Sequence, residues 1–141
     1  MHRRRFLARF SWLSLASAGA GAASENRTVL GVWRATEGDL PLLTMTLTDE
    51  GGSLAGAILF YLIRREPGQP VTASPGIPEP LLHPKWDGRS LTFQVSHRRA
   101  HPPRTLSDPP VSMRLQWTGP NEGLLLVEGG KAPAVQVTRN R

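Results

Sequence analysis

Apolar and hydroxyl side chains alternate along residues 43–48, Leu-Thr-Met-Thr-Leu-Thr. This period of two is typical of a β-strand with one buried face. A turn sequence rich in acid and glycine follows at residues 49–52, and residues 54–63 are almost wholly apolar. The pattern predicts a β-hairpin over residues 42–63, in which Gly56 allows a bend or the close approach of a neighbouring chain.

The same pattern predicts an all-β chain without a helix after its first two dozen residues. Pro84 favours an edge or a bulge in the fourth strand, and Asp87-Gly88 is a two-residue hairpin signal. Eight strands are expected, at residues 29–34, 43–48, 54–63, 81–86, 91–96, 111–117, 124–127 and 134–139.

The connections between these strands differ in length. We expect short turns at residues 49–52, 87–88 and 119–123, and long loops at residues 36–41, 64–80 and 97–110. Alternate connections of a meander lie at the same end, so one end is closed by tight turns and the other carries the long loops. This arrangement predicts an eight-stranded antiparallel up-and-down barrel, whose interior is either filled by side chains or holds one small ligand.

Residues 1–22 have the layout of an export signal, with a basic start, a short apolar run and small residues at the end. Arg3-Arg4-Arg5-Phe6-Leu7 resembles the twin-arginine motif, so this route and the general export route both stay open. The apolar run is shorter than the ~20 residues of a membrane span. We expect residues 23–141 to form one barrel domain, periplasmic or secreted, with no stable membrane anchor after processing.

Charge and cysteine content narrow the function further. The formal net charge is +6, but four of the 17 basic residues precede position 23, which leaves 13 basic and 11 acidic residues, a net of about +2. A nucleic-acid partner is therefore not expected. The absence of cysteine excludes disulfides and thiolate chemistry, so stability must come from packing.

Gly31-Val32-Trp33 near the start and Val137-Thr138-Arg139 near the end resemble the calycins, the lipocalin and avidin superfamily. The resemblance implies a lipocalin-like barrel in which Arg139 stacks on Trp33 and seals the closed end. The avidin ligand residues do not carry over, because Arg-Ala-Thr-Glu stands at residues 34–37, and biotin is not expected. The chain also resembles small exported bacterial proteins, which adds no function.

Enzymatic and metal chemistry are not expected. His97 and His101 are four apart, but Pro102-Pro103 follows them, and a helix that would align them is not predicted. Ser96 and His97 could be drawn as a catalytic pair with Asp108, but adjacent residues of a strand point to opposite faces. We predict neither catalysis nor a cofactor.

Two sets of residues are candidates for binding. The first is the predicted interior, which is either a filled core or the lining of a cavity: Trp33, Met45, Leu47, Ile58, Phe60, Phe93, Val95, Met113, Leu115 and Trp117. The second is a basic mouth in the long loops, either solvated or suited to carboxylate or phosphate groups: Arg64, Arg65, Arg98, Arg99, His101 and Arg104.

These sets favour an exported, non-enzymatic barrel that binds a small apolar or anionic amphiphilic molecule. The alternative is an envelope interaction or inhibitor protein with a filled barrel, which acts through its proline- and arginine-rich loops.

Overall fold

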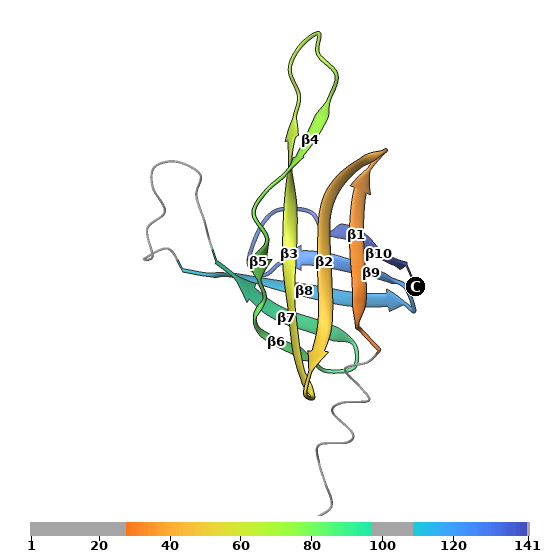
Figure 1. Cartoon of the computed structure of the whole chain (residues 1–141), viewed down its shortest axis with the longest axis vertical. Helices are drawn as coiled ribbons and strands as arrows, with labels where there is room; N and C mark the ends of the chain where they lie inside the picture. Colours follow the sequence, from red (N-terminus) through yellow and green to blue (C-terminus); the bar gives the residue numbers. More distant parts are fainter. Residues whose placement is uncertain (1–27, 97–108, 141) are drawn as a thin grey trace, which may run out of the picture.

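The computed structural model describes residues 28–96 and 109–140, and in this part of the chain every regular element is a β-strand (Figure 1). All strand pairs are antiparallel, as the alternating pattern predicted. The strands are β1 (Gly31–Glu37), β2 (Leu40–Glu50), β3 (Ser53–Arg64), β4 (Thr72–Pro75), β5 (Glu79–Pro80), β6 (Leu82–Trp86), β7 (Ser90–Val95), β8 (Val111–Gly119), β9 (Glu122–Val127) and β10 (Val135–Asn140).

Nine strands form one continuous sheet in the order β4-β3-β2-β1-β10-β9-β8-β7-β6, and β5 pairs with β3 beside this path. The sheet curls into a half-barrel, in which β1 to β3 cross in front of β7 to β10 (Figure 1). The first and last strands, β1 and β10, pair at its centre. The predicted meander order is therefore present from β1 to β3 and from β6 to β10.

The core lies between the two parts of the curled sheet. Its side chains come from matched register positions, such as the row of Trp33, Met45 and Ile58 across β1, β2 and β3. These three residues are at most 1% exposed, and Leu91 and Leu115 form a similar row across β7 and β8. Strand alternation thus places one face of β1, β2, β3, β7, β8, β9 and β10 in a single core.

Arg139 seals one end of this core, and the predicted contact with Trp33 is confirmed. The two residues are register partners, and the guanidinium carbon lies 4.9 Å from the centroid of the indole ring. Arg139 is 7% exposed and donates hydrogen bonds to the carbonyl oxygens of Thr28, Leu30 and Pro120 at 2.5–2.8 Å. Its Nε also donates to Asn121 Oδ1 at 3.3 Å. We call this set of contacts the Arg139 seal.

Two predicted loops are wrong. Residues 36–41 were expected to form a loop, but β1 and β2 extend to a two-residue turn at Gly38-Asp39, where Gly38 adopts a φ of 60°. Residues 64–80 were expected to be a loop because of their prolines, but they contain β4 and β5. Proline is tolerated there because β4 is the end strand of the path, so one side of its backbone has no ladder to complete. The predicted loop at 97–110 lies largely outside the described residues.

Two local predictions are confirmed. The β6–β7 pairing shifts register between Leu82 and Lys85, around Pro84, as expected of a bulged strand. Gly56 allows a close approach, since a Cβ there would lie 2.1 Å from the carbonyl oxygen of Thr46.

The Arg139 seal predicts that substitutions at Trp33 and Arg139 have non-additive effects on the free energy of unfolding. Trp33→Ala should lower the free energy of unfolding by ~3–5 kcal/mol as a core truncation. Arg139→Ala should cost about 2–4 kcal/mol, because it removes the hydrogen bonds of a charged group together with its packing against the indole of Trp33. The double variant should cost less than the sum by about 1 kcal/mol or more in urea unfolding. Strict additivity would contradict the contact, and Arg139→Lys is the control that keeps the charge but not the planar fork.

The turn before β7 predicts a pH dependence. The pKa of Asp87 is lowered from its ordinary value of 3.8, because its Oδ1 accepts hydrogen bonds from the backbone N–H groups of Ser90 and Arg89 at 2.7 and 2.8 Å. A lowered pKa in the folded state stabilises the fold above pH 3.8, and this contribution is lost as the pH falls through the lowered value. The urea midpoints of the wild type and of Asp87→Ala should differ at neutral pH and converge under acid. A gap that stays constant in acid would contradict this, and Asp87→Asn isolates the effect of the charge.

Candidate functional site

Most of the predicted interior residues are part of a packed core. Trp33, Met45, Phe93 and Met113 are at most 5% exposed, and all four belong to the core cluster. The other predicted interior residues in this cluster are Leu47, Ile58, Val95 and Leu115. Of the two interpretations of the interior set, these positions support the filled core.

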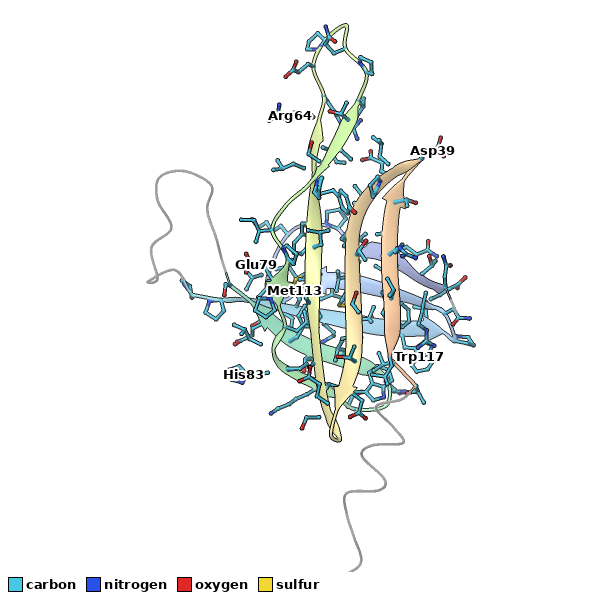
Figure 2. The ribbon with its side chains drawn as sticks, viewed as in Figure 1. Asp39, Arg64, Glu79, His83, Met113 and Trp117 are labelled. Atoms are coloured by element: carbon cyan, nitrogen blue, oxygen red, sulfur yellow. The ribbon has the colours of Figure 1, made fainter. Side chains whose placement is uncertain are left out.

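Trp117 is half-buried and packs against Trp86. Their ring centroids are 5.3 Å apart and the rings are tilted by 38°. The indole N–H of Trp86 is buried and has no hydrogen-bond partner among the described residues. Figure 2 shows Trp117 at the lower end of the half-barrel and Met113 near its middle. These positions make Trp117 part of the packing at one end of the molecule.

Phe60 is not interior, contrary to the prediction, and is 40% exposed. Phe60 does share a strand face with the buried Ile58, as the alternation predicts. However, the pairing of β2 with β3 ends at Leu43 and Phe60, and β3 continues to Arg64 with β4 as its partner. The second layer of the core does not cover this extension.

The uncovered extension is a projecting hairpin, which we call the β3–β4 arm and define as residues 60–77. It extends away from the half-barrel (Figure 1). All four large apolar side chains that are exposed in the described part of the chain lie within it, namely Phe60, Leu62, Val71 and Ile77. Exposed apolar side chains that cluster in this way typically mark an interaction site, whereas singly scattered ones do not.

One face of the arm combines apolar side chains with a cation. Phe60, Leu62 and Arg64 follow one another on the face that begins at Ile58, and we call these three residues the inner face of the arm. Exposure rises along it, from 0% at Ile58 to 40% at Phe60 and 63% at Leu62. The opposite face is more covered, since Tyr61 and Ile63 are half-buried.

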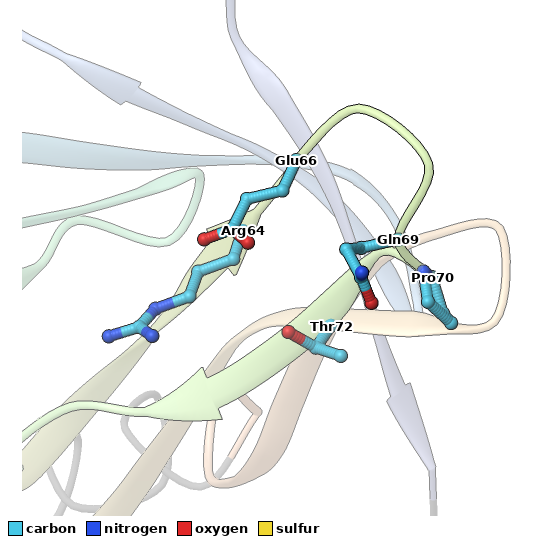
Figure 3. A pocket seen from close by; sticks show the side chains of 5 residues that line it. All are labelled: Arg64, Glu66, Gln69, Pro70 and Thr72. Atoms are coloured by element: carbon cyan, nitrogen blue, oxygen red, sulfur yellow. The ribbon is translucent and has the colours of Figure 1, made fainter.

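A small hollow lies at the outer end of the arm. It has a volume of about 200 Å³ and is lined by Arg64, Glu66, Gln69, Pro70 and Thr72 (Figure 3). Figure 3 shows the carboxylate of Glu66 beside the stem of Arg64, and the side chains of Gln69 and Thr72 close to each other. The guanidinium of Arg64 extends away from Gln69 and Thr72 in this view, so the hollow itself is bordered by the stem of Arg64, an amide, a hydroxyl group and one carboxylate.

The predicted basic mouth is present only in part within the described residues. Arg64 and Arg65 are neighbours in the chain, but Arg65 forms an ion pair with Glu37 of β1, whereas Arg64 has no ion pair or hydrogen bond among the described residues. The pair is exposed on both sides, so it contributes little to stability. The other predicted residues of the mouth, Arg98, Arg99, His101 and Arg104, lie outside the described part of the chain.

Sequence reasoning missed a second hollow, of about 250 Å³, along β6, β7 and β8. His83 in this region has a φ of 50°, the positive φ of a non-glycine residue, and lies within the bulge of β6. The bulge at Pro84 was the signal that could have drawn attention to it. The hollow is lined by His83, Lys85, Thr92, Phe93, Gln94, Ser112, Met113 and Glu128.

The two buried charged residues among those described are Arg139 and Glu79. Glu79 lies in β5 opposite Ile58 and is 8% exposed (Figure 2). Within the described ranges, no three histidine, aspartate or glutamate side chains gather closely enough to hold a metal ion. His97 and Asp108 of the drawn catalytic set lie outside these ranges.

Residues 28–96 and 109–140 contain no long apolar helix of the kind that spans a membrane. Comparison of the chain with protein-family models, with curated proteins and with solved structures gives no match.

Proposed function

We propose that this is an exported, non-enzymatic binding protein, which takes up a small apolar or amphiphilic molecule on the inner face of the β3–β4 arm. The observation that carries the proposal is the exposure of Phe60 and Leu62 on a strand face that is continuous with the core. The binding surface thus moves from the predicted interior to the extension of β3.

The packing of the base of the arm supports this function. Ile58 is fully buried and pairs in register with Met45, so β3 enters the arm from a fixed position. On the far side, Gly76 donates a backbone hydrogen bond to the carbonyl oxygen of Phe60 at 2.9 Å. A scaffold that orders the apolar side chains in advance lowers the entropic cost of binding.

A calycin-like closed barrel is part of the proposal. Two contacts support it. β5, which directly precedes β6 in the chain, pairs with β3, and the N–H of Leu81, between β5 and β6, donates a hydrogen bond to the carbonyl oxygen of Gly56 in β3 at 2.9 Å. This route would join the two ends of the half-barrel. The Arg139 seal agrees with the family resemblance of Trp33 and Arg139.

A second candidate is a protein-interaction or inhibitor role. The filled core favours it, because the same exposed side chains could dock on another protein. Native mass spectrometry of protein purified from its own host separates the two functions. A co-purifying small molecule would support the first, and a stoichiometric protein partner would support the second.

Probe binding tests the site. An apolar fluorescent dye should bind the wild type, and Leu62→Ser should weaken this binding about 5- to 10-fold, since burial of a leucine side chain contributes ~1.5–3 kcal/mol when it is complete. Thr46→Ser is a matched exposed substitution on β2 and should leave binding unchanged. Both variants should keep the wild-type free energy of unfolding within ~0.5 kcal/mol in urea unfolding. Equal dye binding by Leu62→Ser and wild type would contradict the site.

Export is also a proposal, and it is tested at the N-terminus. The mature protein extracted from its host should begin near Ala23, because the basic, apolar and small-residue segments end at residue 22. N-terminal sequencing checks this, and a mature protein that begins at Met1 or His2 would contradict it.

A further inference from the structure

We infer that the ligand of the arm carries an acidic head group, carboxylate or phosphate, which is held at Arg64, while its apolar chain lies over Leu62 and Phe60. This inference rests on the proposed binding function and specifies the ligand. It follows from the order of the side chains along one strand face, apolar near the core and cationic at the outer end.

The spacing along β3 defines an elongated surface. Phe60 and Arg64 are four residue steps apart along the strand, a distance of about 13 Å at a rise of ~3.3 Å per residue. The register partner of Phe60 is Leu43, which is 4% exposed and belongs to the core. The apolar chain of a ligand whose head group lies at Arg64 would thus run over apolar surface toward the rim of the core.

The charge and donors at Arg64 fit an oxyanion. Its guanidinium has no partner among the described residues, while the planar fork matches carboxylate and phosphate oxygens. Thr72, its register partner in β4, and Gln69 line the hollow beside the stem of Arg64, whereas the guanidinium extends away from them, so the head group is assigned to the guanidinium alone. Glu66 lines the hollow as well, and its negative charge opposes the binding of an anion.

The order of the side chains favours a single amphiphile over a bilayer surface. The outermost part of the arm carries Arg65, Glu66 and Gln69, which are exposed and polar. Insertion of the arm into a bilayer from its tip would bury these groups before Leu62 and Phe60, and burial of charged groups is costly. A monomeric ligand that lies along the face meets no such penalty.

The test compares ligands that share a chain and differ in the head group. The purified protein is titrated calorimetrically with dodecanoate, dodecyl phosphate and dodecanol as monomers, at neutral pH and low ionic strength. At least one of the two acidic ligands should bind roughly 3- to 10-fold more tightly than dodecanol, because a charge-assisted contact at an exposed arginine contributes modestly. The tighter of the two acids identifies the head group as carboxylate or phosphate.

Matched variants assign this difference to one side chain. Arg64→Gln should abolish the preference for the acidic ligands and leave dodecanol binding unchanged. Arg65→Gln, the neighbouring arginine that pairs with Glu37, should keep the preference. Glu66→Gln should strengthen the binding of the acidic ligands several-fold, since it removes the opposing charge.

Each remaining outcome overturns a distinct part of the argument. If none of the three ligands binds, the proposed function itself fails. If all three bind equally, or if Arg65→Gln has the effect expected of Arg64→Gln, the function stands and the head-group assignment fails. Binding of inorganic phosphate as tightly as dodecyl phosphate would overturn the role of the ligand's apolar chain. Binding to anionic phospholipid vesicles without binding of the monomeric ligands would show that the arm recognises a membrane surface and not a single amphiphile.

Discussion

The fold depends on one buried cation. Arg139 is the penultimate residue of β10, yet the residue is only 7% exposed and its guanidinium lies over the indole of Trp33. A buried charge is tolerated only where hydrogen bonds replace its hydration. Here the carbonyl oxygens come from the approach to β1 and from the turn between β8 and β9, so one side chain joins three segments that are far apart in the sequence. In a chain without disulfides, this contact fixes the centre of the sheet.

The rest of the structure follows from that fixed centre. The pairing of β1 with β10 sets the register of Trp33, and the row from Trp33 through Met45 to Ile58 carries the same register outward to β3. All three side chains are almost fully buried, so a slip of β3 by one residue would turn its apolar face to solvent. The position at which β3 leaves the core is therefore determined by packing, and the arm begins from a rigid base.

The sequence pattern predicted the parts of the fold that depend on local alternation. It placed strands over eight of the nine strands of the sheet path, all but β4, and the resemblance to the calycins paired Trp33 with Arg139. It failed at residues 64–80, because the tolerance of proline depends on which strand lies at the end of the sheet, and that is a tertiary property. It also placed Phe60 inside, since alternation identifies the face of a residue but not the point at which the opposite layer ends. The hollow at Arg64 could not be predicted, because it requires the register of Arg64 with Thr72.

An arm that exposes apolar side chains at the end of a sheet is also a risk, since unpaired strand edges recruit other chains. The sequence of the arm limits this risk. β4 has four residues and ends in Pro75, and Pro70 and Pro78 stand on either side of it. Proline has no backbone N–H to donate, so a further strand could not form a continuous ladder along this edge. The prolines that made residues 64–80 look like a loop thus block strand addition at the edge of the arm, while Phe60 and Leu62 stay exposed on its inner face. Such a surface suits a ligand that packs against the side chains of this face rather than a partner that adds a strand to the sheet.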